Sequence, residues 1–116
     1  MLKIGIIGAG RIGKVHLESI CYHVKNATVV AMADPFMNDE TESFIRSFGV
    51  EKVYKDYKEI INDAEIDAVM VCSSTDTHAP ISIEAINAGK HVFCEKPLAN
   101  TVDKILEIAD ALKAHP

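Results

Sequence analysis

Residues 3–13 have the sequence KIGIIGAGRIG, an apolar run that leads directly into the glycines Gly8, Gly10 and Gly13. The run predicts a β-strand, and Ile12, Val15 and the residues beyond them recur at helical spacing. Glycines between a strand and a helix let the backbone approach a pyrophosphate at the helix N-terminus. The same glycines can also serve only tight packing, so the motif needs support from the rest of the chain.

The alternation of short apolar runs with longer periodic stretches continues along the whole sequence, as in parallel α/β sheets. Strands are predicted over residues 3–7, 28–33, 52–54, 67–72 and 90–94. Helices are predicted over residues 12–23, 38–49, 56–62, 78–88 and from 101 onward, from their periodicity and from capping residues. These elements predict an α/β fold, a doubly wound parallel sheet of the Rossmann type with strand order 3-2-1-4-5 and helices on both faces.

Composition narrows the class of protein. The 116 residues, 48% apolar and 25% charged, predict one globular domain over residues 1–116. A net charge of −5 argues against nucleic acid or an anionic membrane as partner. No apolar run is long enough to span a bilayer, and no signal peptide is expected. Cys21, Cys72 and Cys94 form no C-x-x-C pair, so a reducing cytoplasm is expected, and the scattered histidines predict no metal site.

Asp34 ends the second predicted strand, 21 residues after Gly13. A carboxylate about 20 residues beyond the glycines commonly binds the hydroxyls of the adenosine ribose. It would repel a 2′-phosphate, and neither Pro35 nor Phe36 supplies a cation, so NAD is favoured over NADP. The alternative is that Asp34 caps a helix or is simply solvated.

Ligands of open parallel sheets bind where the strands end, an edge that we call the carboxyl edge. Polar groups follow four of the predicted strands there, at the glycine turn, Asp34, the loop after residue 72 and the segment after residue 94. We therefore expect a dinucleotide at this edge. The expected cofactor-binding residues are Gly8, Gly10, Arg11, Ile12, Gly13, Asp34, Ser73, Ser74, Thr75 and His78, and Glu95 and Lys96 are further polar groups expected at the same edge.

Several of these residues have a plainer alternative. Ser73, Ser74 and Thr75 could be ordinary loop polarity, and His78 could complete a helix cap instead of reaching a cofactor. Lys96 follows an apolar strand, where an ammonium could assist removal of a substrate hydroxyl proton. From the residues alone, a solvated turn lysine is the favoured interpretation of Lys96.

Three blocks of sequence together resemble one known family. They are GIIGAGRIGKVH at residues 5–16, VVAMADP at residues 29–35, and THAP followed by AGKHVFCEKPLA at residues 77–80 and 88–99. They resemble the glucose–fructose oxidoreductase / inositol 2-dehydrogenase family over essentially the whole chain, and the first block is most similar to inositol dehydrogenases.

The resemblance implies an NAD-dependent dehydrogenase that transfers a hydride between a secondary alcohol of a cyclic polyol or sugar and nicotinamide. It implies that Lys96 is the catalytic-site lysine and that Glu95 contacts the nicotinamide ribose. It also implies a second, substrate-binding domain, absent here, which would supply an aspartate and a histidine. We therefore expect this chain to be a fragment that is inactive alone, and a homo-oligomer because the fifth strand is apolar and unprotected.

Two other classes of function stay open at this point. A non-catalytic dinucleotide-sensing or regulatory module would need the glycine turn and Asp34 but would not need Lys96. A Rossmann domain that binds coenzyme A or another nucleotide would not require an acid at position 34.

Overall fold

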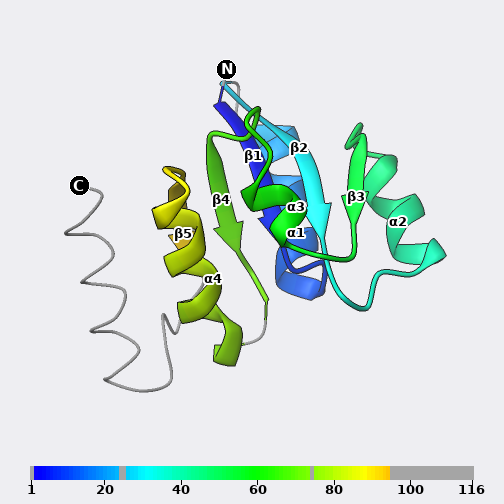
Figure 1. Cartoon of the computed structure of the whole chain (residues 1–116). Helices are drawn as coiled ribbons and strands as arrows, with labels where there is room; N and C mark the ends of the chain where they lie inside the picture. The colour runs from blue at the N-terminus through cyan, green and yellow to red at the C-terminus, as the bar shows by residue number, and fades with distance from the viewer. Residues whose placement is uncertain (1, 24–25, 74, 95–116) are drawn as a thin grey trace.

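The computed structural model describes residues 2–23, 26–73 and 75–94. Its elements, in chain order, are β1 Leu2–Ile7, α1 Arg11–His23, β2 Ala27–Ala33, α2 Asp39–Arg46, β3 Lys52–Tyr54, α3 Lys58–Ile61, β4 Ala68–Val71, α4 Thr75–Asn87 and β5 His91–Cys94 (Figure 1). The predicted last helix, beyond Thr101, lies outside the described residues. All five predicted strands are present, with ends that differ by one residue at most.

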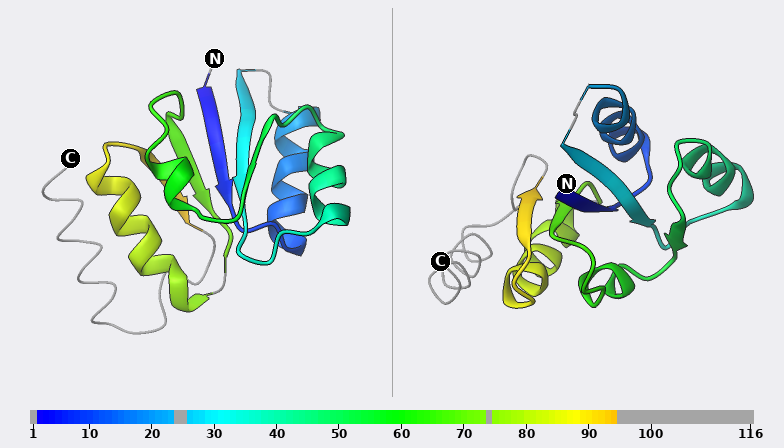
Figure 2. Two further views of the ribbon diagram at one scale, coloured as in Figure 1. Left: turned by 45° about the vertical axis from the view of Figure 1, so that its right-hand side comes forward. Right: turned by 90° about the horizontal axis from the view of Figure 1, so that it is seen from above.

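The strands form one parallel sheet in the order β3-β2-β1-β4-β5, which confirms the predicted topology. The view from above shows α1 and α2 on one face of the sheet and α3 and α4 on the other (Figure 2). The strand order reverses between β1 and β4, because the chain starts at β1, builds outward to β3, and then crosses to β4. All five strands end at one carboxyl edge, and the crevice beside β1 and β4 is the usual place for a ligand in such a sheet.

Alternate residues of the central strands enter two separate cores. Ile6 and Met32 pack with Leu17 of α1 and Ile45 of α2, and all four side chains are fully buried. The opposite face buries Val69 and Val71 of β4 and the side chains that α3 and α4 bring to them, namely Ile60, Ile81 and Ala85. Both faces of β1, β2 and β4 are apolar, as expected for a parallel sheet between two helical layers.

The ends of α2 and α3 test the capping residues that were predicted from the sequence. The Asn38 side chain accepts a hydrogen bond from the Thr41 N–H at 2.8 Å, and Gly49 follows α2 with a φ of +87°, so the predicted caps of α2 are confirmed. The capping pattern predicted for Asp56 and Glu59 was wrong: the N-cap residue of α3 is Tyr57, and the Asp56 carboxylate accepts a hydrogen bond from the Lys58 N–H at 2.9 Å just before the helix.

The prediction for the start of α4 was wrong. Pro80 was expected in the first turn, but α4 begins at Thr75 and contains Pro80 in its interior. Proline lacks the N–H that an interior position donates. Hydrogen bonds from side chains hold the first turn of α4 to the residue before the helix. The Ser73 and Thr77 hydroxyls lie 2.7 Å apart, and His78 Nε2 donates to the Ser73 carbonyl at 2.8 Å.

Candidate functional site

The glycine turn after β1 is packed so closely that two of its glycines have no room for a side chain. Gly8 has a φ of +104°, and a Cβ there would lie 2.6 Å from the Cys72 carbonyl carbon. A Cβ on Gly13 would collide with the Gly8 carbonyl oxygen. Gly10, by contrast, is exposed and has no atom within 4 Å of the place where its Cβ would be. The turn therefore presents open backbone at Gly10, above a tightly packed base.

Asp34 joins the glycine turn to the loop that follows β2. One of its carboxylate oxygens accepts a hydrogen bond from the Ala9 N–H at 2.7 Å, and the other accepts from the Phe36 N–H at 2.8 Å. The backbone is fixed as well, because the Asp34 N–H donates to the Tyr54 carbonyl at 3.1 Å. Asp34 is thus neither a helix cap nor simply solvated: its carboxylate is held, half-buried, at the carboxyl edge. Each oxygen retains a free lone pair for a further donor.

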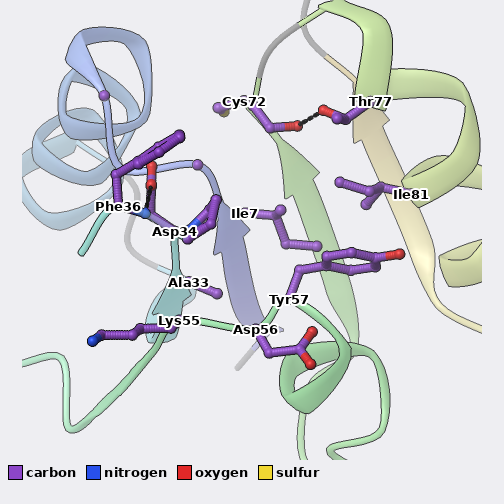
Figure 3. Close-up of a pocket in the computed structure, with 14 residues that line it drawn as sticks. Ile7, Ala33, Asp34, Phe36, Lys55, Asp56, Tyr57, Cys72, Thr77 and Ile81 are labelled. Carbon is purple, nitrogen blue, oxygen red and sulfur yellow. Dashed lines mark hydrogen bonds between the residues drawn. The ribbon is translucent and has the colours of Figure 1, made fainter.

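A pocket of about 640 Å³ opens at the carboxyl edge between β1, β2 and β4. Figure 3 shows Asp34, Phe36 and Lys55 on one flank and Cys72, Thr77 and Ile81 on the other. The lining residues are Ile7, Gly8, Gly10, Ala33, Asp34, Pro35, Phe36, Lys55, Asp56, Tyr57, Cys72, Ser73, Thr77 and Ile81. The pocket is mostly apolar, with one fixed carboxylate and the open glycine turn, and this combination suits a flat aromatic group attached to a sugar and phosphates.

Tyr57 closes the pocket on the side of α3. Its hydroxyl donates a hydrogen bond to the carboxylate of Glu84 on α4, so the two helices of that face are joined beside the pocket. Partial burial, together with the hydrogen bond and the negative charge of Glu84, raises the pKa of Tyr57 to about 12. At neutral pH, Tyr57 is therefore an un-ionised wall residue whose ring faces the pocket (Figure 3).

The structure brings some of the predicted site residues together and leaves others apart. Gly8, Gly10, Asp34 and Ser73 all line the pocket. Arg11 and Ile12 are exposed on α1, and Gly13 is buried under Gly8, so these three residues are not among the lining residues. His78, only 2% exposed, also lies outside the lining and secures the first turn of α4. Ser74, Glu95 and Lys96 lie outside the described residues, as does the side chain of Thr75.

Sequence reasoning missed the loop after β3, which contributes Lys55, Asp56 and Tyr57 to the pocket. The polar segments after the other four strands were recognised, but Asp56 was interpreted only as a helix cap. The signal was available, because a third parallel strand ends at the same edge as its neighbours. Phe36, 86% exposed beside Asp34, was likewise considered only for its lack of charge.

Neither a metal centre nor a membrane segment is found within residues 2–23, 26–73 and 75–94. Over those residues, no three His, Cys, Asp or Glu side chains gather as metal ligands. The helices there are all too short or too polar to cross a membrane.

Comparison with known proteins agrees with this geometry. A family model described as "Oxidoreductase family, NAD-binding Rossmann fold" matches residues 2–116. The chain is 44% identical over 109 residues to the myo-inositol 2-dehydrogenase of Thermotoga maritima, which covers 91% of this chain and 32% of that protein. It is 43% identical over 111 residues to an inositol 2-dehydrogenase of Klebsiella pneumoniae, covering 95% of this chain and 33% of that protein.

Among solved structures, the chain is similar to scyllo-inositol dehydrogenase from Lactobacillus casei with bound NAD(H) and scyllo-inositol. The TM-score is 0.91 at 34% identity, over 99% of this chain and 34% of that one. A probable dehydrogenase from Thermotoga maritima gives the same TM-score at 41% identity. The chain therefore spans about a third of the length of the relatives that it matches.

Proposed function

Since the chain belongs to the oxidoreductase family with an NAD-binding Rossmann fold, we propose that it is the cofactor-binding domain of a dehydrogenase that acts on a cyclic polyol such as inositol. The observation that carries the proposal is the Asp34 carboxylate, held beside the glycine turn in a pocket at the carboxyl edge. The relatives named for inositol oxidation at 37–44% identity support the substrate class. Their greater length supports a further, substrate-binding domain in the whole protein.

The pocket residues fit the parts of NAD in order. Gly10 has free space above its backbone, so a diphosphate can approach the N-terminus of α1 there. The Asp34 oxygens can accept hydrogen bonds from the hydroxyls of the adenosine ribose, and the apolar walls from Ile7 to Ile81 can hold the adenine. Ser73, Ser74 and Thr75 remain candidates for the diphosphate or the second ribose. Bound NAD would supply a hydride acceptor at nicotinamide C4.

The protein's part in the reaction is positioning and proton handling. We assign Lys96 to assist removal of the proton from the substrate hydroxyl as the alcohol carbon loses its hydride. Glu95, next to it, would contact the nicotinamide ribose. These two roles follow from the family resemblance of residues 88–99 and from the place of Glu95 and Lys96 in the sequence, directly after the last residue of β5.

Titration of NADH and NADPH by calorimetry tests the cofactor assignment. We expect NADH to bind about 10- to 100-fold more tightly, because Asp34 opposes a 2′-phosphate. Asp34→Ala should narrow the difference. Equal affinities in the unmodified protein would refute the role of Asp34.

Lys96→Ala in the full-length protein tests the enzymatic assignment. Turnover of an inositol should fall about 100-fold or more, while NADH affinity changes only a few-fold, because the lysine handles a proton and does not anchor the cofactor. Normal turnover in the variant would make Lys96 a surface lysine. A protein that binds NADH but oxidises no polyol even before substitution would favour the alternative, a dinucleotide-sensing module.

A further inference from the structure

The loop after β3 contributes a lysine, Lys55, to the pocket that also holds the Asp34 carboxylate. Tyr54 pairs with Ala33 in the sheet, and its carbonyl accepts the Asp34 N–H at 3.1 Å. Lys55 follows Tyr54 directly, and both Lys55 and Asp34 line the pocket. Figure 3 shows Lys55 on the same side of the pocket as Asp34 and Phe36, with its ammonium pointing outward from the pocket. The backbone of Lys55 is therefore fixed next to that of Asp34, while its ammonium is free to move on a four-carbon stem.

This ammonium has no competing engagement in the part of the chain that the structure describes. Lys52 is paired with Asp63 at 2.6 Å, and Lys90 donates to the carbonyls of Asp63 and Ile66 at 2.8 Å each. Lys55 takes part in none of the ion pairs there and is exposed. The nearby Asp56 carboxylate accepts from the Lys58 backbone N–H instead. A phosphate bound on this flank would find Lys55 available.

We propose that Lys55 is a second specificity-determining residue of the dinucleotide site, positioned to bind a phosphate on the 2′-oxygen of the adenosine ribose. The inference rests on the proposed function, since it requires that ribose to lie against Asp34. A 2′-phosphate would be repelled by Asp34 and attracted by Lys55, so the preference for NAD depends on the balance of the two charges. Removal of the Asp34 charge alone should then raise the affinity for NADP, because the mobile Lys55 ammonium can turn toward a phosphate on this flank.

The test is a cycle of variants in the full-length protein, with NADH and NADPH affinities measured by titration of cofactor fluorescence. Asp34→Ser should raise NADPH affinity about tenfold or more, and Asp34→Ser with Lys55→Met should lose most of that gain. Lys55→Met alone should weaken NADPH more than NADH. Methionine keeps an apolar stem of similar length, so the pocket wall is retained. Thermal unfolding of each variant verifies that it is folded.

Lys58→Met is the matched control. Lys58 is an exposed lysine three residues further on that does not line the pocket, so its loss changes the net charge equally but removes no predicted phosphate ligand. Combined with Asp34→Ser, it should leave the NADPH gain within about twofold at 0.15 M salt, where distant surface charges are largely screened. The proposal fails if Lys55→Met and Lys58→Met reduce the gain equally, or if neither does. Absence of NADH binding in the unmodified protein would instead refute the proposed function.

Discussion

Gly10 differs from the other two glycines of its motif in what surrounds it. Gly8 and Gly13 are packed against backbone, whereas nothing lies within 4 Å of a Cβ placed at Gly10. The three positions therefore have different reasons to lack a side chain. Gly8 and Gly13 allow the turn itself to form, and Gly10 leaves room for a molecule that is not part of the protein.

Gly10→Ala and Gly13→Ala should separate these two roles. Gly10→Ala should change the free energy of unfolding by less than about 1 kcal/mol, because the backbone there has no positive φ. It should weaken NADH binding about tenfold or more, a loss of about 1.4 kcal/mol, by obstructing the diphosphate. Urea unfolding and calorimetric titration measure the two effects.

Gly13→Ala should mainly change the free energy of unfolding and not the contact with the diphosphate. Alanine favours a helix by about 1 kcal/mol over glycine, but the collision with the Gly8 carbonyl oxygen should outweigh that gain and lower stability by about 1–3 kcal/mol. If Gly10→Ala binds NADH as well as the unmodified protein does, the diphosphate does not lie at the turn.

At the scale of single residues, sequence was informative where the signal is local. The glycine spacing and Asp34 could be predicted because each lies directly after a strand and is marked by residue type. Nothing in the residue type of Lys55 or Tyr57 indicates a binding site. Their place in the pocket depends on β3 pairing with β2 and on the contact with α4, both of which are non-local. Arg11 and Ile12 were predicted together with the glycine motif; both are exposed at the start of α1 and neither lines the pocket.

At the scale of elements, the bond from Tyr57 to Glu84 links α3 to α4 across one face of the sheet. α3 is a single turn of helix, Lys58–Ile61, and an isolated helix of that length is unstable. Its position therefore depends on Ile60 and Ile61 in the core and on this link. The pocket wall formed by Tyr57 depends on the same contacts.

Tyr57→Phe should lower the free energy of unfolding by about 1 kcal/mol at pH 8, because one hydrogen bond is lost and Glu84 keeps no phenol partner. The effect should depend on pH. The folded-state pKa of Tyr57, about 12, is above the ordinary value of 10.0, so its stabilising contribution is complete below pH 10 and disappears as the pH rises through 12. The unmodified protein and the variant should therefore converge in stability between pH 10 and pH 12.

Urea unfolding across this pH range measures the convergence, and Tyr22→Phe is the matched control. Tyr22 is 71% exposed and contacts the Phe48 ring with its own ring, so loss of its hydroxyl should change little. A constant difference between Tyr57→Phe and the unmodified protein up to pH 12 would show that the bond to Glu84 does not stabilise the fold.

The start of α4 shows what local signals cannot provide. Proline is common in the first turn of a helix, and this preference placed the predicted start near His78, with Pro80 in the first turn. The structure begins the helix a full turn earlier, because His78 and Thr77 bond back to Ser73. Those bonds exist only once β4 has brought Ser73 to the carboxyl edge. By contrast, α2 was placed correctly because Asn38 and Gly49 act within the helix's own ends.

At the scale of the whole molecule, the two helical layers formed by the described residues, which end at Cys94, do not cover the sheet equally. α1 and α2 contact β1, β2 and β3, and on their side of the sheet Phe93 of β5 is 53% exposed. Ile12 and Val15 on α1 are exposed as well, and the His16 ring packs edge-on against Phe93. An exposed group of large apolar side chains commonly marks a contact surface.

We therefore expect this 116-residue chain to self-associate through the surface formed by Ile12, Val15 and Phe93. Light scattering over a concentration series should show an apparent mass that rises with concentration. Phe93→Asp should suppress this rise in apparent mass, because a charge at that position opposes apolar contact. Phe36→Asp is the control: Phe36 is also exposed, but it lines the pocket and is not part of this surface, so its substitution should leave the rise unchanged. A monomer at high micromolar concentration would contradict the expectation.

Asp34 both joins two backbone segments of the folded protein and is proposed to bind the ribose, and this combination affects the rate at which the domain binds its cofactor. Both carboxylate oxygens are already bonded, to the Ala9 and Phe36 N–H groups, so the glycine turn and the loop after β2 are joined in the folded protein. The conformational entropy of ordering these segments is lost during folding and not at the moment of association. Binding of the adenosine end need not wait for a loop to close, and should proceed in a single kinetic phase whose rate rises linearly with cofactor concentration.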